Sequence, residues 1–305
     1  MNSHLQLAVI GGGPAGLRAA EVAAAAGLGV TLFDAKPSVG RKFLVAGKGG
    51  LNLTHGEEAA RFAMRYDGPD QPAGIWRGLL ADFDAAAMRE WAAGLGVETF
   101  QATSGRVYPK ALKAAPLLRR WITRLKSHGV RFEMNHRWRG FAPGSPQRLE
   151  FSNGAIFTAD AVVFALGGGS WPQTGSDGGW LSVFKSLGIA CDPLVAANCG
   201  WEHPWPPDVL AAAEGKPLKN LVVSAGGKTA AGELLVTRYG IEGGAIYQLG
   251  PSLRAMKEPV IGIDFKPTFT CARLIAKMES VRRDFLNEAR IRWRLGDAAT
   301  AILGR

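Results

Sequence analysis

The apolar and polar positions of the first 34 residues predict a strand, a helix and a second strand. Residues 5–10 (LQLAVI) form a short apolar run of the kind found in buried strands. After a GGGPAG turn, an alanine-rich stretch continues to Ala26, and Gly27 is a typical helix-stop residue. Residues 29–34 (GVTLFD) form the second apolar run. A βαβ unit of about 30 residues is the size of one mononucleotide-binding half of a Rossmann domain.

The pattern from residue 36 to residue 190 predicts the rest of one α/β domain. We expect a loop region rich in glycine and lysine at residues 36–56, and then mainly helical structure at 57–128 with SGRVYPK (104–110) as an irregular break. A β-meander should follow at 130–157, with a turn at Asn153 and Gly154. After it we expect a buried strand at 159–166 and a helix over 178–187.

The character of the chain changes near residue 190. Tryptophan and proline cluster in GWEHPWPP (200–207), and two hairpin-like runs follow, before a helical stretch from Thr270 onward. We therefore predict two domains: a Rossmann-like domain over residues 1–190, and an inserted, β-rich second domain that ends in helices over residues 191–305. The predicted fold class is α/β.

The turn of the first βαβ unit carries a nucleotide-binding pattern, Gly11-x-Gly13-x-x-Gly16. In such turns the first glycine permits the sharp bend, the second lets the backbone approach a pyrophosphate, and the third lets helix and strand pack closely. Pro14 stands near the helix start, where its missing N–H costs little. Asp34 closes the second strand, about 20 residues on, where an acidic residue accepts hydrogen bonds from a ribose. The turn therefore predicts a site for FAD or NAD rather than NADP, with Ala15 and Ala35 beside it.

Composition bears on the partners, the location and the metal content that we expect. With 36 Lys and Arg against 26 Asp and Glu, the formal charge is +10, and the basic residues are densest at 119–139. No aromatic-basic RNA motif accompanies them, so we expect a solvated surface that also attracts anionic cofactors, and we favour it over the alternative, a nucleic-acid surface. No signal peptide and no apolar run of about 18 residues is present, so no membrane is expected. The three unpatterned cysteines predict a reducing, cytoplasmic location and, with no ligand spacing elsewhere, no metal site.

A second loop, GRKFLVAGKGGLNLTH (40–55), follows the acidic residue. A plain NAD-dependent dehydrogenase does not need it, whereas an FAD enzyme must also cover the flavin end. Together with GGGPAG, ALGGGSWPQTGSDGG and GELLVTRYGIEGGAIY, it resembles the BaiN-like family of NAD(P)/FAD-dependent flavoproteins, also described as aminoacetone-oxidase-like, along essentially the whole chain. The resemblance implies an FAD-dependent oxidoreductase acting on a small organic substrate, with NADPH or NADH as a transient reductant. It implies that further residues line the FAD: Gly40, Arg41, Lys42, Gly47, Gly49, Asn52, Thr54, Ala165, Leu166 and Gly167.

In this family the inserted domain lies over the flavin. The resemblance therefore places the turn that contains Arg238 and Tyr239 near the flavin ring. Relatives commonly carry histidine at the position of Arg238, so an acid–base role for that histidine does not transfer. Arg238 is a candidate for offsetting the negative charge of a reduced flavin or for holding an acidic substrate, and a surface arginine is the alternative. Tyr239 is a candidate for donating a proton, and a packed core tyrosine is the alternative.

Family members usually continue for most of another hundred residues, with a closing glycine-rich FAD motif that this sequence lacks. From that difference we expect weaker FAD retention than in a full-length relative. Two other functions stay open at this point: a flavoprotein that acts on RNA, and a non-catalytic flavin-binding remnant. The sequence does not determine the oligomeric state.

Overall fold

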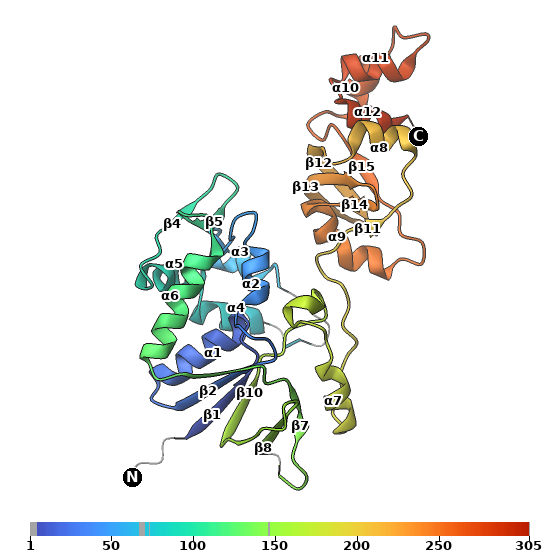
Figure 1. Ribbon diagram of the computed structural model, residues 1–305. Coiled ribbons are helices and arrows are strands. Elements are labelled where there is room, and N and C mark those ends of the chain that lie inside the picture. The colour runs from blue at the N-terminus through green and yellow to red at the C-terminus, as the bar shows by residue number, and fades with distance from the viewer. Residues whose placement is uncertain (1–4, 67–70, 73, 146, 305) are drawn as a thin grey trace. The chain divides into compact units, whose positions relative to one another are not determined.

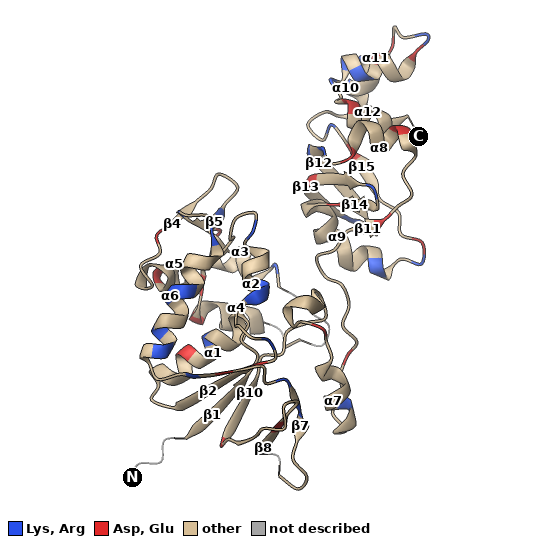
Figure 2. Ribbon diagram, viewed as in Figure 1, with Lys and Arg blue, Asp and Glu red and all other residues tan. Residues whose placement is uncertain are grey.

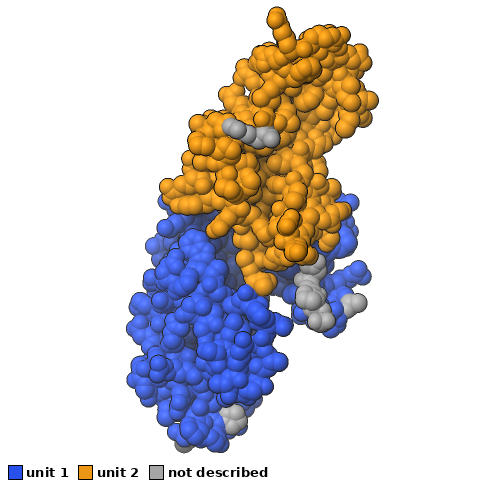
Figure 3. Space-filling view, turned by 90° about the vertical axis from the view of Figure 1, so that its right-hand side faces the viewer, with its two compact units in different colours: residues 1–194 blue, residues 195–305 orange. Residues whose placement is uncertain are grey.

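The computed structural model describes residues 5–66, 71–72, 74–145 and 147–304. The chain forms two compact units, unit 1 (Met1–Leu194) and unit 2 (Val195–Arg305), which are coloured separately in Figure 3. No helix in the described part of the chain is long and apolar enough to cross a membrane.

The centre of unit 1 is a four-stranded parallel sheet with the order β10-β1-β2-β6. Its strands are β1 (Gln6–Ile10), β2 (Gly29–Asp34), β6 (Arg131–Met134) and β10 (Ala161–Phe164). Helix α1 (Pro14–Ala25) connects β1 to β2 and packs against both. The predicted βαβ unit is thus present, with element ends within two residues of those expected, and the α/β, Rossmann-type fold class is confirmed.

Both faces of this sheet are covered, which explains the nearly continuous apolar runs of its strands. On β1, Leu7 and Val9 point into a core shared with helices α1 and α6 (Ala114–Ser127). Ala8 and Ile10 point to the opposite face, into a second core. That core is closed by a three-stranded antiparallel sheet formed by β7 (Trp138–Phe141), β8 (Arg148–Phe151) and β9 (Ile156–Thr158) (Figure 1).

The structure corrects two expectations for unit 1. The SGRVYPK segment is not an irregular break, because Arg106–Pro109 forms strand β5 between β3 (Thr54–His55) and β4 (Thr99–Gln101). The predicted meander starts later than expected, because β6 pairs in parallel with β2 and only β7–β9 form the meander. Periodicity could not separate these cases, since strand partners are set by distant residues. The remaining helices of unit 1 are α2 (Arg41–Ala46), α3 (Ala59–Ala63), α4 (Ile75–Asp82), α5 (Ala85–Gly94), a 3₁₀ turn (Pro172–Thr174) and α7 (Trp180–Ser186).

Unit 2 contains a five-stranded antiparallel sheet with the order β11-β14-β13-β12-β15. Its strands are β11 (Trp201–Glu202), β12 (Pro217–Ala225), β13 (Lys228–Thr237), β14 (Gly240–Glu242) and β15 (Gly262–Asp264). Helix α9 (Gly244–Ala255) packs on β12 and β13, and α8 (Pro207–Ala213) packs on β13 and α12 (Asp297–Leu303). Helices α10 (Cys271–Ala276) and α11 (Phe285–Arg292) complete the helical end that the sequence predicts from Thr270, whose side chain caps α10.

Candidate dinucleotide site

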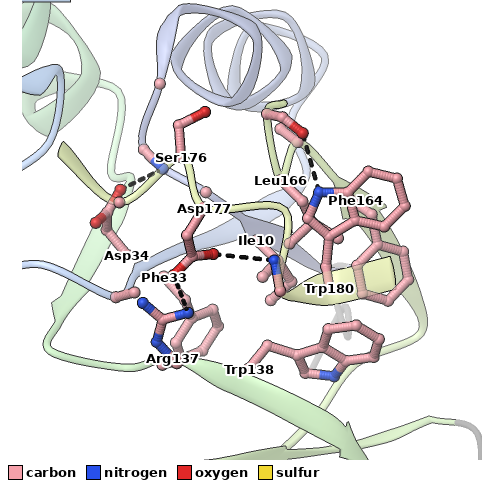
Figure 4. A pocket seen from close by; sticks show the side chains of 18 of the residues that line it. Ile10, Phe33, Asp34, Arg137, Trp138, Phe164, Leu166, Ser176, Asp177 and Trp180 are labelled. Atoms are coloured by element: carbon pink, nitrogen blue, oxygen red, sulfur yellow. Dashed lines mark hydrogen bonds and ion pairs between the residues drawn. The ribbon is translucent and has the colours of Figure 1, made fainter. Parts of the chain in front are cut away.

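A cavity of about 810 Å³ lies in unit 1 at the carboxyl edge of the parallel sheet. Its walls come from the β1–α1 turn, the end of β2, the start of α2, the β6–β7 connection, the end of β10 and residues 174–184 (Figure 4). The volume falls within the roughly 300–1,000 Å³ that is usual for small-molecule and cofactor sites. In open α/β sheets, ligands bind outside the carboxyl ends of the strands, which is where this cavity lies.

The glycines of the β1–α1 turn are pressed against backbone on one side. Gly11 has a φ of 109°, and a Cβ atom there would lie 2.3 Å from the carbonyl oxygen of Ala165. A Cβ atom on Gly16 would lie 1.8 Å from the carbonyl oxygen of Gly11. Gly12 is equally confined, because a Cβ atom there would lie 2.4 Å from Val39 and 2.8 Å from the Asp34 carboxylate. Gly11, Gly12 and Gly16 therefore serve the packing of the turn.

Gly13 differs from its neighbours, because its α-carbon faces open space. No heavy atom lies within 4 Å of a Cβ atom placed there. Gly13 is the N-cap of α1, no side chain caps this end, and Pro14 follows at the first helical position. The first N–H groups of a helix have no partner within the helix, and its positive end attracts anions. Since Gly13, Pro14 and Ala15 line the cavity, the start of α1 fits a bound diphosphate.

This contrast gives a prediction that separates packing from binding. Gly13→Ala should keep the thermal stability of unit 1, because the φ of −76° and the open space accept a methyl group. The same change should weaken binding of ADP about tenfold or more, because the methyl group occupies the path of the diphosphate. Gly16→Ala should instead destabilise the fold by about 1–3 kcal/mol through overpacking. Thermal melting and ADP titration of both variants test this, and equal melting temperatures for the two would contradict it.

Asp34 lies at the end of β2 with both carboxylate oxygens already oriented by backbone. Its Oδ2 accepts the Gly12 N–H at 2.7 Å, and its Oδ1 accepts the Lys36 N–H at 2.8 Å. Burial raises the pKa of Asp34, and the hydrogen bonds from Lys36 and Gly12 only partly offset this effect. The carboxylate thus joins the glycine turn to the cavity wall. A carboxylate accepts further hydrogen bonds on its remaining lone pairs, so a ribose hydroxyl fits here.

Positive side chains surround the same cavity. Arg41 and Lys42 extend from α2, and Arg137 and Arg139 come from the β6–β7 connection and β7. Lys42 Nζ donates to Ser170 Oγ at 2.7 Å and to Ser176 Oγ at 3.4 Å. Another part of the wall is aromatic. Trp138, Phe164 and Phe184 are in ring contact with one another, and Trp180 contacts Phe184. The cavity thus combines a cationic, polar half with a flat, apolar half, which fits an anionic dinucleotide.

Twelve of the seventeen residues that the sequence analysis assigned to the cofactor line this cavity. They are Gly11, Gly13, Pro14, Ala15, Asp34, Ala35, Gly40, Arg41, Lys42, Ala165, Leu166 and Gly167. Gly16 lies beneath the turn. Gly47 follows α2 and contacts Ala114, whereas Gly49 has open surroundings. The side-chain amide of Asn52 lies beside the carbonyl oxygens of Thr54 and Val107, next to the β3–β5 pair to which Thr54 belongs.

Several lining residues were not found from the sequence. Gly12 belongs to the GGGPAG turn and Phe33 to the GVTLFD strand, but only the folded structure shows that both line the cavity. Residues 136–139 and 174–180 line the far side and are more than 100 residues from the fingerprint. The position of residues 136–139 at the cavity could have been predicted. Once β6 is recognised as a parallel partner of β2, the residues that follow it must reach the same edge of the sheet.

The two candidates in unit 2 lie on the β13–β14 turn. The Arg238 guanidinium carbon lies 4.6 Å from the centre of the Tyr239 ring, a cation–π contact. Tyr239 is 66% exposed, so it is a surface residue and not part of a packed core. Glu242 lies on β14, just after this turn, and its carboxylate is next to the Tyr247 hydroxyl. Burial and the negative charge of Glu242 raise the pKa of Tyr247.

Basic residues of the segment at 119–139 are coloured blue on the ribbon in Figure 2, and several of them make contacts within unit 1. Arg120 donates to the carbonyl oxygens of Leu95 and Gly96, at the end of α5. Arg124 forms an ion pair with Glu21 at 3.0 Å, and Arg131 donates to Thr31 at 3.3 Å. These side chains serve the fold, and the expectation of no nucleic-acid partner stays a prediction. Among the described residues, no group of three or more His, Cys, Asp or Glu side chains could hold a metal ion.

The parallel sheet, the glycine turn and the acidic end of β2 define a Rossmann-type dinucleotide-binding protein. A family model described as the HI0933-like protein Rossmann domain matches residues 5–264. The 3-dehydro-bile acid delta(4,6)-reductase of Clostridium scindens is 29% identical over 283 residues, covering 88% of this chain and 66% of that protein. The chain belongs to the HI0933-like Rossmann family, a family of flavoprotein oxidoreductases, and the flavoprotein resemblance noted from the sequence is confirmed.

Solved structures align with parts of this chain. An open-conformation flavocytochrome c3 fumarate reductase aligns with a TM-score of 0.47 at 21% identity, over 61% of this chain and 41% of that one. THI4 of Thermovibrio ammonificans aligns with a TM-score of 0.39 at 18% identity, over 61% of this chain and 64% of that one. The chain spans 66% of the length of the Clostridium scindens reductase.

Proposed function

We propose that this protein is an FAD-dependent oxidoreductase that acts on a small organic substrate, with NADH or NADPH as the reductant. The observation that carries the proposal is the combination of the open, uncapped start of α1 and the oriented Asp34 carboxylate in one cavity. These two groups match the diphosphate and the ribose of a dinucleotide. Family membership favours FAD as that dinucleotide.

In this proposal each part of the cavity has one task. The first-turn N–H groups of α1 hold the diphosphate, and Asp34 binds the ribose. Lys42 and Arg41 balance the phosphate charge, and the small residues at the end of β10, Ala165 to Gly167, leave room for the cofactor. FAD supplies the hydride chemistry when bound, so the protein needs to bind, orient and shield it. Gly47, Gly49, Asn52 and Thr54 would act only by shaping the loop that follows α2.

Unit 2 is proposed to carry the substrate contacts. Arg238 and Tyr239 are joined by their cation–π contact at one exposed turn, which suits recognition of a polar or acidic group. Because the relative in Clostridium scindens is a 3-dehydro-bile acid delta(4,6)-reductase, a 3-dehydro-bile acid is the first substrate to test. The three cysteines are unpaired, as in a reducing compartment, and a cytoplasmic location is part of this proposal.

The test is the absorption spectrum of the purified protein, recorded before and after anaerobic addition of NADPH and then NADH. We expect the bands of a bound flavin, with or without added FAD, and their bleaching by one of the two nucleotides. Loss of the bands on Asp34→Ala, with Asp160→Ala unaffected, would assign the flavin to this cavity. A colourless protein that rejects added FAD would overturn the proposal. Flavin that neither nucleotide bleaches would remove NAD(P)H as the reductant.

A further inference from the structure

The arrangement of the strands determines where the adenine of a bound dinucleotide must lie. The diphosphate belongs at the start of α1, which follows β1, and the ribose belongs at Asp34, which ends β2. In the order β10-β1-β2-β6, the next position on the same side is the end of β6. The His136 N–H donates to the Asp34 carbonyl oxygen at 2.8 Å, so the residues after β6 are held beside the ribose position. A base attached to this ribose would therefore lie beside the residues that follow β6.

Arg137 does not point freely into solvent. Its Nη1 lies 2.9 Å from Asp177 Oδ2, and the other carboxylate oxygen, Oδ1, accepts the Gly179 N–H at 3.1 Å (Figure 4). Burial would raise the pKa of Asp177, but the hydrogen bonds from Gly179 and Arg137 outweigh it and lower the pKa. Both side chains line the cavity. One guanidinium nitrogen of Arg137 is thus held by a carboxylate that is itself oriented by backbone.

Asp177 belongs to a glycine-rich segment, residues 168–179, which we call the strap. The strap follows β10 and comes close to β2, because a Cβ atom on Gly175 would lie 3.2 Å from the Lys36 side chain. Lys42 tethers it through Ser170 and Ser176, and Ser176 also donates to the Gly168 carbonyl oxygen at 2.9 Å. The strap thus extends from the end of β10 to the end of β2, and the Arg137–Asp177 pair joins it to the residues after β6.

We propose that the Arg137–Asp177 pair is the adenine-recognition element of this site, with the guanidinium plane lying against the base and Asp177 acting as its positioning residue. An arginine guanidinium stacks on aromatic planes, and one fixed in advance loses less freedom on binding. This inference deepens the proposed function, because it assigns residues to one end of the proposed dinucleotide. It also predicts that the site distinguishes FAD from FMN, which lacks the adenosine part.

The experiment measures the dissociation constants of FAD, ADP and FMN for wild type, Arg137→Met, Asp177→Asn and the double variant. Arg137→Met should weaken FAD and ADP about tenfold and leave FMN unchanged. Asp177→Asn should weaken the same two ligands by a smaller factor. The double variant should be no weaker than Arg137→Met alone, because Asp177 acts through Arg137 and the two effects are then not additive.

A matched ion pair in unit 2 provides the control. Arg290 Nη1 lies 2.8 Å from Asp297 Oδ1, in a pair of the same residue types outside the cavity. Arg290→Met and Asp297→Asn should leave all three dissociation constants at the wild-type values. Melting temperatures of all variants identify any change that acts through folding, and ADP binding by Asp177→Asn keeps the test informative if Arg137→Met folds poorly.

The outcomes separate this inference from the proposed function. Wild-type protein that binds ADP but not FAD would overturn the FAD assignment, while the ADP arm still decides the role of the pair. Variants that bind FAD and ADP as tightly as wild type would overturn the inference and leave the FAD proposal standing. Tighter binding by the variants would show that the pair obstructs the site, and an equal loss of FMN affinity would show that it does not act on adenine. Either result overturns the inference.

Discussion

Replacing Glu21 with alanine is expected to lower the free energy of unfolding of unit 1 by about 3 kcal/mol, the lower end of what losing one partner of a buried ion pair costs. Glu21 lies on α1 and is only 5% exposed. Four donors converge on its carboxylate: Arg18 at 2.9 Å, Trp91 at 2.9 Å, Trp121 at 3.1 Å and Arg124 at 3.0 Å.

The reason for this effect is that the donors come from three helices. Trp91 belongs to α5, Trp121 and Arg124 belong to α6, and the two indole rings are in edge-to-face contact at 4.7 Å. Without the carboxylate, the buried Trp121 N–H loses its acceptor, and an unsatisfied buried donor is costly. The arginines are partly exposed and can return to water, which is why the lower figure is expected.

Urea unfolding followed by circular dichroism and tryptophan fluorescence measures this loss. The control is Glu98→Ala, because Glu98 also forms an ion pair, with Lys110, but both side chains are largely exposed. Its unfolding midpoint should match that of wild type, since exposed ion pairs contribute little. If Glu21→Ala unfolds at the wild-type urea concentration, the carboxylate does not hold the three helices together.

The same residue predicts a dependence on pH. Burial alone would raise the pKa of Glu21, but hydrogen bonds from Arg18, Trp91 and Arg124 outweigh it and lower the pKa below 4.5. The stabilising contribution is then complete above the unfolded-state pKa and is lost as the pH falls through the lower, folded-state value. The stability difference between wild type and Glu21→Gln should therefore be full at pH 7 and shrink below about pH 4.5.

The sequence predicted the local parts of this molecule well for a physical reason. The β1–α1 turn depends on residues that are neighbours in the chain, and the glycine spacing and Asp34 lie within about 25 residues of one another. The apolar runs of β1 and β2 reflect burial on both faces of the sheet. That signal is strong for parallel strands.

The parts that could not be predicted depend on contacts between distant residues. Nothing near Glu21 in the sequence indicates that Trp121 and Arg124, about a hundred positions later, satisfy its charge. Likewise, the position of Arg137 and Asp177 at the cavity becomes evident only when β6 is placed beside β2. The loop after α2 is a related case. Asn52 and Thr54 follow the family pattern, and the sequence did not predict that they contact β5 and each other. Their assignment to FAD stays a prediction.

Asp34→Ala is expected to weaken binding of FAD and of ADP about 100-fold. A hydrogen bond to a charged group contributes about 1.5–3 kcal/mol, and 1.4 kcal/mol corresponds to a tenfold change. The ribose would lose its acceptor, and the Gly12 N–H would lose the partner that fixes the glycine turn at 2.7 Å. Because burial raises the pKa of Asp34 above 3.8, wild-type affinity should also begin to fall at a higher pH than for an ordinary aspartate.

Asp160 supplies the control for this experiment. Its Oδ2 accepts the Gln6 N–H at 2.7 Å, so it makes the same kind of contact as Asp34, but just before β10, at the amino end of the sheet. Asp160→Ala should lower stability slightly and leave the dissociation constants of both ligands unchanged. Fluorescence titration with FAD and calorimetry with ADP measure these constants. Since ligands of this fold bind at the carboxyl edge, an equal loss of affinity in the two variants would mean that Asp34 supports the sheet and does not bind ribose.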